Sequence, residues 1–190
     1  MPQSPLPITR VAIIGAGVAG RSFALACAAA GFFVVLEDVM PANLRRAEAE
    51  YADASLGGAF GVLQLASTVE EAVREADIAV DFVPDELESK LEIFSMIDRM
   101  APPRTILCTP SYALSITDLA SCVYRPDRCI AVRGNLTAAA ADIRLLYPAS
   151  INKSVLAAIE DFLQALGFQT STESDPDIPL LVKNSPALPV

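Results

Sequence analysis

Residues 11–20 of the chain read VAIIGAGVAG, an apolar run followed at once by the spacing G-x-G-x-x-G. Four consecutive apolar residues predict a strand that is buried on both faces. The Ala- and Leu-rich stretch at residues 21–30 predicts a helix, and the glycine at position 31 is a favoured helix end. The order of strand, glycine turn and helix is typical of the opening of a βαβ unit, so this stretch predicts a parallel sheet.

Apolar strands and helices continue to alternate along the chain. The sequence predicts further strands at residues 32–36, 64–66, 78–83 and 105–108, and helices at residues 43–51 and 87–100. Thr68 and Glu71 fit a capping box that would open a short helix. After Pro126 the rhythm changes, and the prediction is strands at residues 129–132, 143–146 and 168–170 with one amphipathic helix at residues 153–166.

The tail, residues 175–190, holds four of the fourteen prolines and is predicted to be an extended strand and a loose end. Taken together, the pattern predicts an α/β protein with a Rossmann-like three-layer fold and a mostly parallel sheet. We expect a single domain over residues 1–190.

The glycine spacing is weak evidence alone, but its place between a strand and a helix gives each glycine a physical role. Gly15 makes the tight turn, Gly17 lets the backbone approach a pyrophosphate, and Gly20 allows the helix to pack closely. The N-terminus of the helix stabilises phosphate charge. The residues predicted to bind a dinucleotide here are Gly15, Ala16, Gly17, Val18, Ala19 and Gly20. The alternative is a glycine turn kept for packing in a fold that no longer binds a dinucleotide.

An acidic residue completes this prediction. Asp38 lies eighteen residues beyond Gly20, at the end of the second predicted strand. An acid at this place accepts hydrogen bonds from the ribose hydroxyls and repels a 2′-phosphate, which favours NAD over NADP. Glu37 is the rival for the role.

Composition excludes several classes of function. The chain has no histidine, which rules out Ser-His-Asp triads, Cys-His pairs, His-ligated metals and His general bases, and we expect no metal site. The net charge of −9 and the lack of a basic run argue against a nucleic-acid partner. The four cysteines form no CxxC pair and are predicted to be buried reduced thiols. With no apolar signal core and no membrane-length apolar run, we expect a cytoplasmic protein with no membrane partner.

Four more stretches carry a resemblance to a known family. They read ADIAVDFVPD at residues 76–85, ESK at 88–90, LSITDL at 114–119 and VKNSP at 182–186. With the glycine motif, they make the chain resemble the NAD-binding domain of the 3-hydroxyacyl-CoA dehydrogenases from about residue 11 to residue 186. The resemblance implies that Asp85, an acid after Val-Pro, and Lys90, five residues on, lie near the nicotinamide ribose. The alternative for both is a solvated helix start and an exposed ion pair.

The resemblance fails where the family places its catalytic histidine. The corresponding run at residues 131–136 reads AVRGNL, which puts Arg133 at the histidine position. The glutamate that orients this histidine falls near Ile143 or Arg144, with Asp142 close by, and no acid is clearly aligned. A guanidinium stays protonated, so Arg133 cannot act as a general base, although it can polarise a carbonyl or hold a carboxylate. The alternative is an arginine that caps a strand end or pairs with a surface acid.

A third cluster also differs from the family. The family's Asn-Thr-Ser-Ser corresponds to PSYA at residues 110–113, which contains Tyr112. The chain also stops where the family continues into a helical domain, and we expect a naturally short relative rather than a truncated one.

Three hypotheses follow. The chain is a divergent NAD-binding protein without the His/Glu mechanism, or an NAD-dependent oxidoreductase on a 3-hydroxyacyl-CoA or another small hydroxy or keto compound, with Tyr112 or Lys90 as proton donor. The third is a non-catalytic interaction or regulatory subunit. The high apolar fraction predicts an exposed patch and hence a homodimer.

Overall fold

The structure of the protein is a computed structural model that describes residues 7–58 and 60–175. The strand and loose end predicted for the tail fall on residues 176–190, outside the described residues, as does the family-like run at residues 182–186.

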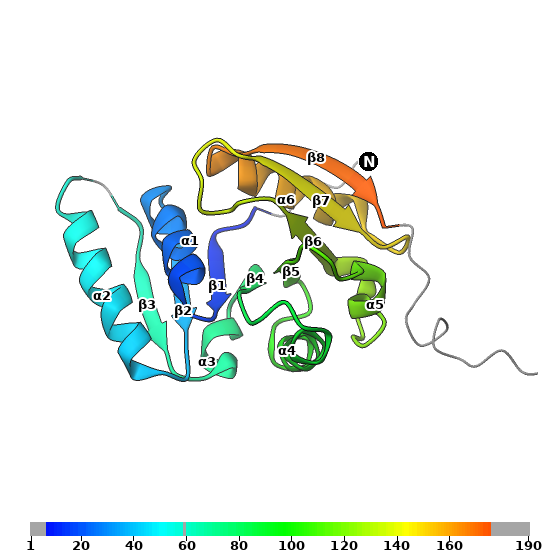
Figure 1. The fold of residues 1–190 in the computed structure, drawn as a ribbon, viewed down its shortest axis with the longest axis horizontal. Coiled ribbons are helices and arrows are strands. Elements are labelled where there is room, and N and C mark those ends of the chain that lie inside the picture. The colour runs from blue at the N-terminus through cyan, green and yellow to red at the C-terminus, as the bar shows by residue number, and fades with distance from the viewer. Residues whose placement is uncertain (1–6, 59, 176–190) are drawn as a thin grey trace, which may run out of the picture.

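One mixed sheet organises the fold (Figure 1). Within the described residues eight strands pair in the order β3-β2-β1-β4-β5-β6-β7-β8. In chain order they are β1 Arg10–Ile14, β2 Phe33–Glu37, β3 Leu63–Ala66, β4 Ile78–Asp81, β5 Ile106–Pro110, β6 Cys129–Arg133, β7 Asp142–Tyr147 and β8 Gln169–Ser174. Strands β1 to β6 run parallel, β7 is antiparallel to β6, and β8 is parallel to β7. The carboxyl ends of the first six strands therefore lie at one edge of the sheet, which we call the carboxyl edge.

Helices cover both faces of this sheet, as the three-layer prediction requires (Figure 1). On one face lie α1 (Val18–Ala29), α2 (Pro41–Ser55) and α6 (Lys153–Ala165), and on the other lie α3 (Val69–Val73), α4 (Leu87–Met100) and α5 (Ile116–Ala120). A single 3-10 turn, η1 (Pro126–Arg128), precedes β6. Successive residues of β1 alternate between two apolar cores: Ile13 packs with α1, and Ile14 packs on the face of α4. The fold prediction is confirmed.

The helix cap predicted at Thr68 is confirmed. Thr68 caps α3, with its Oγ1 accepting a hydrogen bond of 3.3 Å from the amide of Glu71.

No helix in the described part of the chain is long and apolar enough to cross a membrane. One detail of the cysteine prediction is wrong, because Cys122 is exposed in the turn two residues beyond α5. Burial raises the pKa of the Cys27, Cys108 and Cys129 thiols.

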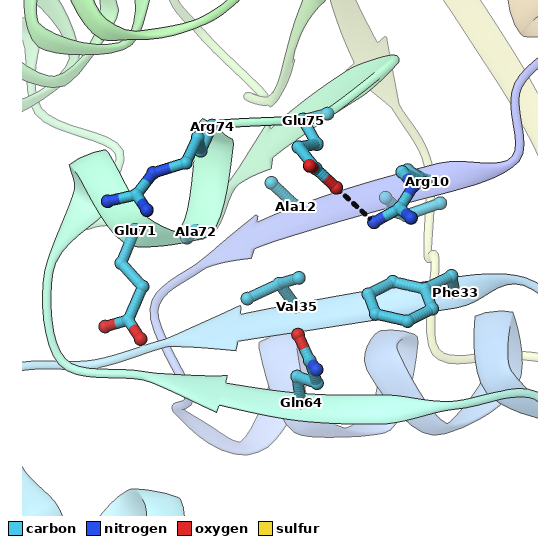
Figure 2. Close-up of a pocket in the computed structure, with 11 residues that line it drawn as sticks. Arg10, Ala12, Phe33, Val35, Gln64, Glu71, Ala72, Arg74 and Glu75 are labelled. Carbon is cyan, nitrogen blue, oxygen red and sulfur yellow. Dashed lines mark ion pairs between the residues drawn. The ribbon is translucent and has the colours of Figure 1, made fainter.

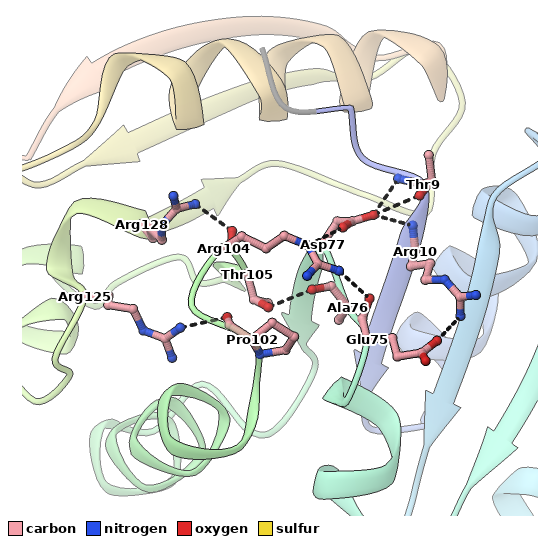
Figure 3. Close-up of polar contacts among 10 residues, drawn as sticks. All are labelled: Thr9, Arg10, Glu75, Ala76, Asp77, Pro102, Arg104, Thr105, Arg125 and Arg128. Carbon is pink, nitrogen blue, oxygen red and sulfur yellow. Dashed lines mark hydrogen bonds and ion pairs between the residues drawn. The ribbon is translucent and has the colours of Figure 1, made fainter. Parts of the chain in front are cut away.

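A polar cluster ties the strands together at the amino edge, opposite the carboxyl edge (Figure 3). Asp77, which precedes β4, accepts hydrogen bonds of 2.9 to 3.0 Å on Oδ2 from the amide and hydroxyl of Thr9 and from the amide of Arg10. Its Oδ1 accepts from Nε of Arg104 at 3.1 Å, and the carbonyl of Arg104 accepts from Arg128 at 2.6 Å. A single carboxylate thus joins the starts of β1 and β4 to the loop before β5.

Candidate functional site

The glycine turn joins β1 to α1 at the carboxyl edge. Gly15 has a φ of +99°, a conformation that side chains disfavour, and a Cβ there would lie 3.3 Å from the backbone of Phe82. A Cβ on Gly20 would overlap the carbonyl oxygen of Gly15. Both glycines are therefore required by close backbone packing, as the motif predicts.

Gly17 differs from the other two, because, apart from its chain neighbours, no described residue comes within 4 Å of the place where its Cβ would be. It is the N-cap of α1, a helix of 12 residues, and no side chain caps its opening amides. The positive end of the helix dipole therefore faces open space beside a residue that leaves the backbone accessible. Of the predicted phosphate-binding residues, Ala16 lies in this turn, and Val18 and Ala19 open α1. Their contact with a pyrophosphate stays a prediction.

Asp38 lies directly after β2 and faces the glycine turn. Its Oδ2 accepts hydrogen bonds from the amide of Ala16 at 2.8 Å and from Nδ2 of Asn43 at 3.0 Å, while Oδ1 accepts from the amide of Met40 at 2.7 Å. A carboxylate has about four lone-pair sites, so capacity remains for a ligand hydroxyl. Asn43 was not anticipated from the sequence, because it reads there as an ordinary helix residue.

Glu37, the rival acid, is the last residue of β2 and is only 4% exposed. Burial, and secondarily the charge of Asp38, raise the pKa of Glu37 to about 6, and a hydrogen bond from the amide of Gly15 opposes this rise. Both acids lie against the same cleft, but Asp38 is the one bonded to the turn.

That cleft has a volume of about 610 Å³ and opens along the carboxyl ends of β1, β2 and β4. Gly15 and Gly17 form one end, Glu37 and Asp38 one wall, and Phe82 to Pro84 lie opposite. Ligands of open α/β sheets bind outside the carboxyl ends of the strands, so this is the expected place for a dinucleotide.

Another cavity, of about 270 Å³, lies on the sheet face beside α3 (Figure 2). It opens beside Arg10 and Phe33, the first residues of β1 and β2, where Arg10 pairs with Glu75 at 2.6 Å. It therefore lies toward the amino ends of these strands, away from the glycine turn.

The two residues that the resemblance implied near the nicotinamide ribose have different surroundings. Asp85 is exposed, and its Oδ2 accepts a hydrogen bond of 2.9 Å from the amide of Tyr112, which links the loops after β4 and β5. Lys90 is only 1% exposed, and its Nζ lies 2.6 Å from Oδ1 of Asp81 and 3.1 Å from the carbonyl of Pro110. The alternative of an exposed ion pair is wrong for Lys90, because its side chain is buried against Asp81 and Pro110. Lys90 therefore has almost no exposed surface through which it could contact a ligand directly.

Arg133, at the carboxyl end of β6, faces another arginine. The strand register places Arg144 of β7 directly opposite Arg133, and Ser171 of β8 directly opposite Arg144. Directly opposed residues point to the same side of a sheet, so the three side chains form a cross-strand row. The row lines a cavity of about 440 Å³ together with Tyr112 and Asp142, among other residues. We call it the arginine cavity.

Comparison with known proteins identifies the family of the chain. The sequence profile of the family described as 3-hydroxyacyl-CoA dehydrogenase, NAD binding domain, matches residues 10–133, more than half of the chain. The chain belongs to this family. Its cofactor is NAD.

Individual relatives agree with the family. The chain is 33% identical over 138 residues to a probable 3-hydroxybutyryl-CoA dehydrogenase of Bacillus subtilis, covering 66% of this chain and 48% of the relative. It is 27% identical over 188 residues to 5-formyl-3-hydroxy-2-methylpyridine 4-carboxylate 5-dehydrogenase of Mesorhizobium japonicum, covering 93% of this chain and 60% of the relative. The solved 3-hydroxyacyl-CoA dehydrogenase of Archaeoglobus fulgidus has the same fold, with a TM-score of 0.76 at 24% identity over 93% of this chain and 60% of that one. The chain thus spans about half to three fifths of the length of these relatives.

Besides Asn43, sequence reasoning missed or left open three members of the site. Asp81 reads as the end of an apolar strand, yet it holds Lys90. Arg144 was one of two open positions for the residue facing Arg133, and Ser171 gave no signal at all, because only the strand register brings them into one row.

Proposed function

We propose that the chain binds NAD(H) in the cleft at the carboxyl edge and does not carry out hydride transfer by the family's His/Glu mechanism. NAD(H), when bound, supplies a hydride acceptor or donor, and the substrate hydroxyl must then lose or gain a proton. The observation that carries the proposal is Arg133 facing Arg144 across β6 and β7. A guanidinium keeps its proton, and the residue directly opposite Arg133 is a second arginine rather than an acid that could orient a base.

A fluorescence titration with NADH tests the cofactor site. The chain has no tryptophan, so protein emission interferes little. We expect saturable binding that Gly17→Val abolishes, because its side chain would fill the open space before α1. Asp38→Ala should weaken binding, and Arg46→Gln, an exposed position on α2, should leave it unchanged. Absence of binding by the folded protein at millimolar NADH would contradict the proposal.

Turnover is tested separately with acetoacetyl-CoA and NADH. We expect no enzyme-dependent loss of NADH absorbance, because no group at β6 can exchange the proton. Turnover at a rate typical of the family would refute the proposal that the His/Glu mechanism is lost, whatever the NADH titration shows.

An NAD-dependent oxidoreductase on another small hydroxy or keto compound is the second candidate. Tyr112 favours it, since this exposed phenol lines the arginine cavity and can serve as a proton donor. Turnover that is lost in Tyr112→Phe would support this candidate, and unchanged turnover would remove Tyr112 from the mechanism. A folded protein that binds no NADH and turns over none of these compounds would favour an interaction or regulatory subunit.

A cytoplasmic homodimer completes the proposal. The cysteines of the described residues are free, which suits a reducing compartment. Exposed apolar side chains outside the cleft, among them Leu56 and Tyr124, suit contact with a second subunit. Sedimentation at micromolar concentration should give twice the mass of 20.1 kDa.

A further inference from the structure

The arginine cavity contains hydrogen-bond donors that the protein itself does not use. Nε of Arg133 is shielded from solvent and has no hydrogen-bond partner among the described residues. Its Nη2 makes one long contact, of 3.4 Å, with the carbonyl of Leu114. A shielded guanidinium donor without a partner is costly, and such groups are normally satisfied by protein or ligand.

The charges around this donor are also unbalanced. Arg133 and Arg144 are directly opposed on neighbouring strands, an arrangement that like charges destabilise. Arg144 has a distant partner, Glu173 at 3.4 Å, and both side chains are about half exposed. Among the residues that line the cavity, Asp142 is the acid, so the lining carries one net positive charge in a chain of net charge −9.

We propose that the arginine cavity binds the carboxylate of a small hydroxy or keto acid. Directly opposed residues of an antiparallel pair lie about 4.5–5.5 Å apart at Cα, so both guanidinium groups can reach one anion. The planar fork of arginine matches a carboxylate in two parallel hydrogen bonds. One net positive charge suits a monoanion, and Asp142 opposes a dianionic phosphate.

The position of the cavity gives the bound acid a place beside the cofactor. Arg133 ends β6, and Tyr112 follows β5, on the same edge of the sheet as the glycine turn. The amide of Tyr112 is held by Asp85 from the loop after β4, next to the cleft. This inference takes the position of the bound cofactor from the proposed function and rests on it in that respect. The substrate class is then a free acid rather than an acyl-CoA thioester.

Isothermal titration calorimetry tests the inference with 3-hydroxybutyrate as the probe and methyl 3-hydroxybutyrate as its uncharged match. Each is titrated into the intact protein with and without saturating NADH, a pair of reduced partners that cannot react. We expect the acid to bind, and the ester to bind about 10- to 100-fold more weakly, the usual effect of losing hydrogen bonds to a charged group.

Variants locate the binding. Arg133→Gln should weaken acid binding about 10- to 100-fold and leave the ester unaffected, and Arg133→Lys should recover part of the loss because it keeps the charge without the fork. Arg46→Gln is the matched control and should stay within about twofold of the native protein, because surface charges act weakly at a distance. Unchanged NADH binding and thermal unfolding of Arg133→Gln would show that the fold is intact.

Several outcomes would overturn the inference. Equal binding of acid and ester, no binding of the acid, or full acid binding by Arg133→Gln would each do so. Arg133-dependent binding of coenzyme A without binding of 3-hydroxybutyrate would assign the cavity to a phosphate instead. Because the acid is also titrated without NADH, a failure of cofactor binding would refute the proposed function alone.

Discussion

Glu37 places a titratable group inside the cleft wall, where it affects stability. Its pKa rises from an ordinary 4.5 to about 6 because it is buried beside Asp38. The native state therefore holds a proton that the unfolded chain has released, and the free energy of unfolding falls as pH rises from about 4.5 to 6. Above that range Glu37 costs the fold about 2 kcal/mol.

Glu37→Gln removes this cost. We expect the variant to gain stability relative to the native protein by about 1–2 kcal/mol more at pH 8 than at pH 4.5. Urea unfolding at the two pH values measures it, and the difference between the proteins cancels the other titrating groups. A pH-independent difference would contradict a raised pKa for Glu37.

Between elements, the buried pair of Lys90 and Asp81 fastens α4 to β4. The two side chains are 1% and 0% exposed and 2.6 Å apart, and the same ammonium reaches the end of β5 through Pro110. Burial raises the pKa of Asp81, and the charge of Lys90 opposes that rise. The pair sits directly beneath the loop that carries Asp85.

Lys90→Met should therefore be strongly destabilising, because it leaves an uncompensated buried carboxylate. We expect a loss of about 3–5 kcal/mol in the free energy of unfolding, measured by urea denaturation. Asp81→Asn combined with Lys90→Met should recover much of the loss. A double variant as unstable as the single one would show that packing, rather than charge, explains the effect.

Elements with a clear period could be predicted from the sequence, and short or direction-dependent features could not. The amphipathic stretch Leu87–Met100 gave α4 its observed bounds, and apolar runs predicted β1, β2, β4, β5 and β6. Strand β8, which reads QTSTES, was predicted only at its first two residues. Helix α5 has five residues, too few to show a period. The direction of β7 left no trace, because an apolar strand reads alike in both directions. Lys90 lies among charged residues in the sequence, which made an exposed side chain a reasonable interpretation.

Across the whole molecule, stability depends on the amino edge, where Asp77 joins segments far apart in the chain (Figure 3). Burial raises the pKa of Asp77, but hydrogen bonds from Thr9, Arg10 and Arg104 outweigh that effect and lower the pKa below 3.8. The resulting stability is present above the unfolded value of 3.8 and is lost as pH falls through the lower folded value.

Asp77→Asn should cost about 1–3 kcal/mol at pH 7, because an amide group replaces one of the two accepting oxygens. Chemical denaturation at pH 7 and pH 3 measures the difference, which should shrink at pH 3, because below 3.8 the unfolded chain binds a proton that native Asp77 resists. NADH affinity should not change. A deficit of the same size at both pH values would contradict a lowered pKa.

The amino-edge cluster and the carboxyl-edge cleft lie at opposite ends of the same strands. A protein arranged in this way offers two independent targets for engineering. Consolidating the contacts around Asp77 should raise the tolerated temperature, while the loops at the far end stay free to be redesigned for a new ligand. Because the sheet separates the two regions, substitutions in one region should not affect the other.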